Sequence, residues 1–150
     1  MARIVGIGHQ DFETVRRKNN FYIDKTEFIK EWWENQDTVT LITRPRRFGK
    51  TLNMSMVENF FSIQSKAEEN LFTGLEIWKE EKYWELHGKY PVIFLSFKGV
   101  DGLTFESARD MLRAQIAQIC NEHDYLLDSK AVSENDKQTF RQLADVVNGR

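Results

Sequence analysis

The sequence has 150 residues, of which 41% are hydrophobic and 13% aromatic, so it is long enough for one domain with a packed core. Because its Lys and Arg residues number 21 and its Asp and Glu residues 23, the formal net charge of -2 excludes a global field that would draw the protein to nucleic acid or to an anionic membrane. The single cysteine, Cys120, excludes an intramolecular disulfide framework and a cysteine-rich zinc site, and no stretch approaches the roughly 20 apolar residues that span a bilayer. We therefore expect a cytoplasmic protein with no membrane partner.

A helix is expected after residues 24–27, whose sequence Asp-Lys-Thr-Glu matches an acidic capping box. In such a box the first side chain accepts a hydrogen bond from the backbone three residues on, and the fourth side chain reaches back. Four apolar residues then line one face of the predicted helix: Phe28, Ile29, Trp32 and Trp33.

Residues 38–43, Thr-Val-Thr-Leu-Ile-Thr, predict a buried strand because they are rich in β-branched residues and contain an apolar pair. The loop 44–51, Arg-Pro-Arg-Arg-Phe-Gly-Lys-Thr, follows at once. An amphipathic helix is expected next, because apolar residues recur at a spacing of three to four positions. These residues are Leu52, Met56, Phe60 and Ile63. The order along the chain is thus strand, loop, helix.

The remainder of the chain repeats this alternation. Residues 65–90 predict short helical pieces and loops, and the continuous apolar run 92–97 after Pro91 is typical of a strand covered on both faces. A helix of about four turns is expected over 105–119, and a polar stretch at 128–137 separates it from a last helix. That last helix carries Phe140, Leu143 and Val147. Alternating strands and helices predict an α/β fold with a parallel sheet.

The loop at 44–51 carries the chemistry. A standard P-loop reads Gly-x-x-x-x-Gly-Lys-Ser/Thr between a strand and a helix, because exposed backbone N–H groups and the helix N-terminus solvate phosphate oxygens together. Gly49, Lys50 and Thr51 match the second half of this Walker A pattern. Gly49 lets the backbone approach the phosphates, Lys50 is expected to reach the β- and γ-phosphates, and the Thr51 hydroxyl is expected to ligate Mg²⁺.

The first half of the loop departs from the standard pattern. Arg44 stands where the first glycine is expected, and Pro45 has a fixed φ and no N–H to donate. Arg46 and Arg47 add charge that can contact phosphates directly. The alternative interpretation is that the Gly-Lys-Thr tripeptide arises by chance and that the arginines form a solvated basic patch or a nucleic-acid contact.

Residues 41–52 resemble the signature of the AAA-ATPase-like family of bacterial proteins, in which an Arg-Pro-Arg-Arg-Phe-Gly-Lys-Ser/Thr loop replaces the standard P-loop. Further matches lie at 6–12, 21–26, 71–75 and 90–93, so the resemblance covers most of the chain. The arginine and proline that depart from the general P-loop are themselves a mark of this family.

The resemblance implies a P-loop NTPase-type parallel sheet flanked by helices, incomplete in this chain. It places the chain, 1–150, as the N-terminal part of such a domain. Within it, 1–37 is a helical region, 38–63 contains the strand, P-loop and helix, and 91–124 contains the second strand and its helix. The implied ligands are ATP and Mg²⁺. The residues expected to bind the nucleotide are Arg44, Pro45, Arg46, Arg47, Phe48, Gly49, Lys50, Thr51 and Leu52.

A hydrolysing P-loop protein also needs an acidic residue at the end of an apolar strand. Family members that resemble this chain carry a Leu-Ile-Asp-Glu-type Walker B strand further along, and many carry a C-terminal nuclease-like domain. Here Lys98 follows the second apolar run, and the nearest acid, Asp101, lies beyond a glycine. The chain is therefore interpreted as the N-terminal part of a longer protein or as a truncated product. We expect nucleotide binding without efficient hydrolysis, and no catalytic residue is assigned.

Three alternatives stay open. The chain could be an interaction module that uses the basic residues of 44–47 to contact a nucleic acid, a protein or a second copy of itself. It could also be a remnant with no activity of its own. Asp24, Lys25 and Thr26 have a second interpretation, implied by the resemblance, as nucleotide contacts, although a helix cap explains Asp24 without a ligand.

The remaining polar and aromatic residues predict structure more than chemistry. The histidines, His9, His87 and His123, lie far apart without ligand spacing, so we expect surface positions and no metal site. Cys120 lies on an apolar helix face and is expected to be a core thiol. The four tryptophans could stack on bases in a single-strand binder, but their helical spacing favours packing.

Overall fold

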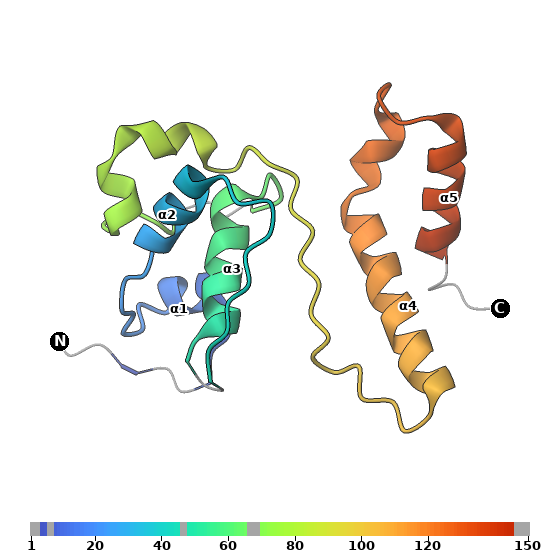
Figure 1. The fold of residues 1–150 in the computed structure, drawn as a ribbon, viewed down its shortest axis with the longest axis horizontal. Coiled ribbons are helices and arrows are strands. Elements are labelled where there is room, and N and C mark those ends of the chain that lie inside the picture. The colour runs from blue at the N-terminus through green and yellow to red at the C-terminus, as the bar shows by residue number, and fades with distance from the viewer. Residues whose placement is uncertain (1–3, 6–7, 46–47, 66–69, 146–150) are drawn as a thin grey trace. The chain divides into compact units, whose positions relative to one another are not determined.

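In a computed structural model, the described residues are 4–5, 8–45, 48–65 and 70–145 (Figure 1). The chain divides into two compact units, Met1–Val92 and Ile93–Arg150. The described parts of both units are built from helices and irregular segments. None of the described helices combines the length and the hydropathy needed to cross a lipid bilayer.

The described part of the first unit contains three α-helices and two 3₁₀-helices. They are α1 (Phe12–Arg17), α2 (Glu27–Asn35), α3 (Lys50–Phe61), η1 (Glu76–Lys79) and η2 (Glu81–Leu86). Helix α1 contacts α3, and α2 contacts η1, which in turn contacts η2. The helices predicted after residues 24–27 and after the loop 44–51 are therefore confirmed, as are short helical pieces within 65–90, of which 66–69 lie outside the described residues.

The core of the first unit is aromatic. Phe12, Phe60 and Phe72 are each fully buried. The ring of Phe72 stacks on that of Phe12 and meets that of Phe60 edge-on, with both pairs of ring centroids 5.0 Å apart. Three of the four tryptophans, Trp32, Trp33 and Trp78, pack against this core, which favours packing over base stacking as their role.

The predicted capping box at 24–27 is wrong. The N-cap of α2 is Thr26, which makes no side-chain cap bond. Instead, Asp24 Oδ1 accepts from the Thr26 backbone N at 2.8 Å and from Thr26 Oγ1 at 2.7 Å, and Asp24 Oδ2 accepts from the Glu76 backbone N at 2.8 Å. The fully buried Thr26 Oγ1 accepts in turn from the Ile77 backbone N at 3.1 Å. The aspartate thus bonds two residues on, not three, and the bonds from Glu76 and Ile77 join the start of α2 to η1.

We expect the Asp24→Asn variant to lose about 1–3 kcal/mol of unfolding free energy, the usual effect of leaving a hydrogen-bonding group without its partner. Asparagine keeps one oxygen that can accept from Thr26, but its second position is an N–H₂ group, which cannot accept from the Glu76 N–H. Urea unfolding followed by circular dichroism measures the loss. The exposed acid Asp37 gives the matched control, Asp37→Asn, which should stay within about 0.5 kcal/mol of the parent. Equal stability of the two variants would contradict the prediction.

The predicted parallel sheet is wrong. Over the described residues, the β-pairing is limited to an isolated parallel bridge between Ser62 and Tyr90. Residues 38–43 and 92–97 are irregular, and several of their apolar side chains are exposed, among them Val39 and Leu41 at 83% each. High β-propensity permits a strand, but a strand forms only where a neighbouring segment takes its N–H and C=O groups. Over the described residues, neither segment forms a β-ladder with another.

The second unit contains α4 (Phe105–Glu122), η3 (Asp124–Asp128) and α5 (Glu134–Ala144), with α4 and α5 packed together as a hairpin (Figure 1). Both predicted helices are confirmed, although α5 begins inside the polar stretch and Val147 lies outside the described residues. A capping box between Thr104 and Ser107 starts α4. Cys120 is buried, as predicted, and its burial raises the pKa of the thiol.

The expected surface positions of two histidines are wrong. His123 is only 4% exposed, and its Nδ1 lies 2.9 Å from the Ile119 carbonyl oxygen. His87 is half-buried and meets the rings of Phe60, Phe72 and Trp78 edge-on. Burial lowers the pKa of His87 from its ordinary value of 6.5, because an apolar environment disfavours the imidazolium.

This lowered pKa predicts a pH dependence of stability. Below pH 6.5 His87 takes up a proton in the unfolded chain but resists it in the folded one. The free energy of unfolding is therefore higher above pH 6.5 and declines as the pH falls. The decline stops once the pH lies below the folded pKa, where both states are protonated. The His87→Gln variant should therefore show a smaller loss of stability between pH 7.5 and 5.5 than the parent. Urea unfolding at the two pH values measures the difference. The same loss in both proteins would contradict this role of His87.

Candidate phosphate-binding site

The loop predicted to bind phosphate runs directly into α3. Arg44, Pro45 and Phe48 are exposed, and α3 begins at Lys50. Arg46 and Arg47, two of the predicted nucleotide contacts, lie outside the described residues. The end of the motif, from Phe48 onward, is therefore described, and it leads into the first turn of α3.

Gly49 is the N-cap of α3 and requires a glycine for its backbone conformation. Its φ of 73° and ψ of 20° lie in the left-handed region, which strains residues with a Cβ. A Cβ at this position would meet nothing within 4 Å, so the dihedral angles demand glycine and the surrounding space does not. The carbonyl of Gly49 accepts from the Asn53 backbone N at 2.9 Å, which closes the first turn of the helix.

The N-terminus of α3 is suited to an anion. The first N–H groups of any α-helix have no partner within the helix, and the helix dipole makes this end positive. The N-cap residue, Gly49, makes no side-chain cap bond, and the first turn of α3 contains no acidic residue. Over the described residues, the first backbone donors are therefore open to an external acceptor, and phosphate is the anion that such helix ends commonly bind.

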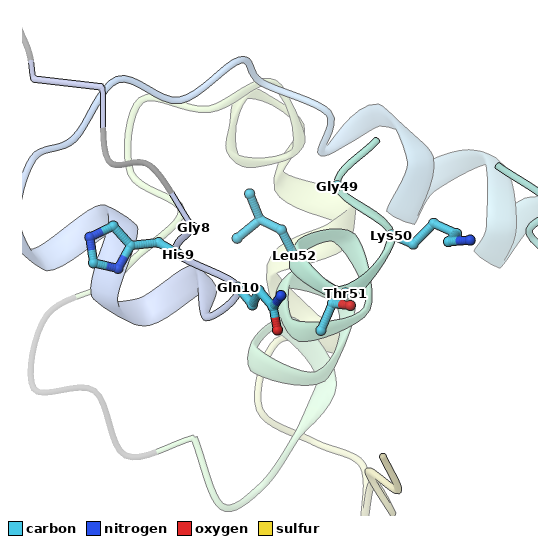
Figure 2. A pocket seen from close by; sticks show the side chains of 7 residues that line it. All are labelled: Gly8, His9, Gln10, Gly49, Lys50, Thr51 and Leu52. Carbon is cyan, nitrogen blue, oxygen red and sulfur yellow. The ribbon is translucent and has the colours of Figure 1, made fainter. Parts of the chain in front are cut away.

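The Lys50 side chain is bonded within the loop. Its Nζ donates to the Arg44 carbonyl oxygen at 2.5 Å. Figure 2 shows this side chain extending away from Gln10. The bond joins Lys50, which matches the P-loop lysine, to Arg44, which stands in place of the first P-loop glycine. A phosphate that recruits Lys50 must therefore replace a backbone carbonyl as its acceptor.

An open cavity of about 700 Å³ lies against the start of α3. One wall comes from α3 and its N-cap, and the other comes from a segment some forty positions earlier in the chain (Figure 2). The residues that line it are Gly8, His9, Gln10, Gly49, Lys50, Thr51 and Leu52. Four of the predicted nucleotide contacts, 49–52, thus lie on one cavity, while Arg44, Pro45 and Phe48 are not part of its lining.

Sequence reasoning missed His9 and Gln10 as residues of this cavity. Their one signal was the family match at 6–12, of which residues 6 and 7 lie outside the described residues. They reach the cavity because the start of α1 is bonded to the middle of α3. The Phe12 backbone N donates to Ser55 Oγ at 3.1 Å, and Ser55 Oγ donates to Asp11 Oδ1 at 3.3 Å.

Asp11 is the acceptor at this junction between α1 and α3, and its carboxylate is charged. Its second carboxylate oxygen accepts from the Thr14 backbone N at 2.7 Å and so caps α1. Partial burial raises the pKa of Asp11, but the hydrogen bonds from Thr14 and Ser55 outweigh it and hold the pKa below its ordinary value. The junction is therefore charged near neutral pH, with its acceptors occupied by groups from both helices.

The cavity lining offers a magnesium ion one hydroxyl, that of Thr51, which is exposed at the second residue of α3. A Mg²⁺ ion held there would complete its shell with phosphate oxygens and water, its usual partners in nucleotide sites. Among the residues that the structure describes, no group of three or more His, Cys, Asp or Glu side chains is arranged to hold a metal ion by itself.

Comparison with known proteins supplies the context for this site. The family model described as Predicted AAA-ATPase matches residues 6–149. An uncharacterized protein in the vnfD 5′ region of Azotobacter chroococcum mcd 1 is 30% identical over 138 residues, which are 91% of this chain and 24% of that protein. The chain thus spans about a quarter of the length of this relative. No solved structure matches the chain.

Proposed function

Because the chain belongs to the Predicted AAA-ATPase family, we propose that it binds ATP, with the phosphates at the N-terminus of α3. The observation that supports this most directly is the cavity at Gly49, Lys50 and Thr51, where an uncapped helix end meets the matching part of the motif. Backbone N–H groups and the helix dipole are the features that bind phosphate at such positions.

Each residue of the motif has a role in this proposal. The left-handed Gly49 turns the chain into α3, so the N–H groups of the first turn face the phosphates. Lys50 exchanges the Arg44 carbonyl for β- and γ-phosphate oxygens, and Thr51 ligates Mg²⁺ through its hydroxyl. The proposal covers binding and assigns no hydrolytic step.

The test is calorimetric titration of the chain with Mg²⁺ and ATP, and separately with inorganic tripolyphosphate. We expect both to bind and each to displace the other, because they share the phosphate part of the site. A chain that binds neither ligand contradicts the proposal. Titration with a single-stranded oligonucleotide tests the alternative that the loop 44–47 is a basic interaction surface. Oligonucleotide binding by such a surface would weaken steeply with added salt and persist in the presence of ATP.

A further inference from the structure

We propose that the C-terminal end of α2 binds the guanidinium group of an arginine side chain. The site is an open cavity of about 230 Å³ lined by Trp32, Trp33, Gln36 and Asp37. It shares no lining residue with the cavity at the start of α3, and the inference does not depend on the proposed binding of ATP.

The four lining residues come from one short stretch of the chain. Trp32 and Trp33 lie in the last turn of α2, and Gln36 and Asp37 follow the end of the helix. Gln36 is left-handed, with a φ of 53°, a conformation that commonly ends a helix. Two indoles, an amide and a carboxylate therefore meet at one helix end.

Three features of this end favour a cation. The last C=O groups of an α-helix have no partner within the helix and form the negative end of its dipole, and the last turn of α2 contains no basic residue. The faces of indole rings attract cations more strongly than those of other aromatic side chains. Asp37 adds a carboxylate to the same cavity.

Asp37 is distinguished from the other acid near this end, Glu34. The Glu34 carboxylate accepts from Lys82 Nζ at 2.9 Å and from the Tyr83 hydroxyl at 2.5 Å, and it is not part of the lining. Asp37 is exposed and forms no ion pair over the residues that the structure describes. Asp37 is therefore the carboxylate assigned to the ligand.

The indoles are held in place without a ligand. Trp32 Nε1 donates to Thr40 Oγ1 at 3.1 Å, and the Trp32 ring meets that of Phe61 edge-on, with centroids 5.5 Å apart. The ring of Trp33 stacks on the same Phe61 at 5.6 Å. Both tryptophans are half-buried, so each packs on the core and also lines the cavity. Rings that are positioned before binding lower the entropy lost on binding.

The size of the cavity and its acceptors favour a guanidinium. The volume lies below the roughly 300–1,000 Å³ of pockets that enclose whole drug-sized ligands, so it suits a head group. A planar guanidinium stacks on an aromatic face, and its fork of N–H donors matches a carboxylate. The Gln36 amide oxygen is a further acceptor for these donors. A quaternary ammonium has no N–H to donate, and a lysine ammonium has no planar face.

The experiment is an NMR titration with N-acetyl-arginine methylamide, followed by the indole N–H signals. The parent chain should bind this blocked arginine about 10-fold or more tightly than the blocked citrulline, which has a similar shape and no charge. The blocked lysine should bind more weakly than the blocked arginine. Asp37→Asn should weaken arginine binding about 2- to 5-fold, the usual range for an exposed ion pair. Trp32→Phe should weaken it as well, because phenyl is a poorer surface for cations than indole.

Asp101→Asn and Trp84→Phe are the matched controls. Both residues are exposed and lie outside the cavity lining, so both variants should bind the blocked arginine as the parent does. Sedimentation velocity with and without the blocked arginine distinguishes the sources of the guanidinium. Only an arginine from a second copy of this chain gives a self-association that the ligand reverses.

Three outcomes would overturn the inference. They are equal binding of the blocked arginine and citrulline, equal binding of the blocked arginine and lysine, and an unchanged affinity in Asp37→Asn. Because Asp37 is exposed, the last result does not depend on a variant that alters the core. Phosphate binding at α3 is decided separately by the titrations with ATP and tripolyphosphate.

Discussion

The Lys50→Ala variant is expected to bind ATP about 10- to 100-fold more weakly than the parent chain, because the change removes a charge-assisted contact worth about 1.5–3 kcal/mol. In the proposed site Lys50 is the cation among the described residues of the cavity lining, so its loss removes the ammonium contact to the phosphates. The Lys50→Arg variant should recover only part of the affinity, since a planar guanidinium does not replace a compact ammonium group. Calorimetric titration with Mg²⁺ and ATP measures all three proteins.

Lys89 provides the control for charge. It is exposed and lies outside the cavity lining, so Lys89→Ala changes the net charge equally without touching the proposed site. Its affinity for ATP should match that of the parent. Loss of affinity in Lys89→Ala as large as in Lys50→Ala would show that the ligand responds to overall charge. Unchanged affinity in Lys50→Ala would exclude this lysine from the site.

Truncation of Phe60 should be the most destabilising single change in the first unit that we consider, at about 3–5 kcal/mol for Phe60→Ala. Phe60 is fully buried, and its ring meets those of Phe61, Phe72 and His87. Alanine would leave a cavity among rings that cannot all move inward. Small proteins are stable by only about 5–15 kcal/mol, so this loss removes a large fraction of the total. Urea unfolding followed by circular dichroism measures it.

Phe105→Ala is the matched change at an exposed site. Phe105 is the first residue of α4 and is 77% exposed, so its truncation removes little buried area. We expect its unfolding free energy to stay within about 0.5 kcal/mol of the parent. A loss in Phe105→Ala comparable with that in Phe60→Ala would contradict the prediction.

The helices of this chain are predictable from sequence because their signal is local. The spacing of Met56 and Phe60 along α3 repeats at the period of a helix, and both side chains are fully buried. The same spacing located α4 and α5. Local patterns carry less information about partners, however. Residues 38–43 and 92–97 have the composition of strands, but no described segment pairs with them.

The residues of the candidate site are likewise predictable only where their sequence signal is local. The motif placed Gly49, Lys50 and Thr51 at the start of a helix, and the structure has them there. His9 and Gln10 reach the same cavity through tertiary contacts, among them the bonds between Asp11, Phe12 and Ser55, which no spacing in the sequence encodes. The role of Asp24 was misread for a similar reason. Its partner Glu76 is distant in sequence, and a capping box considers only near neighbours.

The exposed apolar side chains of the irregular segments have a practical consequence for handling the protein. Val39 and Leu41 are 83% exposed, and Ile93 and Phe97 are 69% and 66% exposed. Sulfate and phosphate salts strengthen the association of such surfaces because they are excluded from them. The solubility of this chain should therefore fall sharply as ammonium sulfate is added, and chloride buffers of moderate strength are the better medium for the titrations.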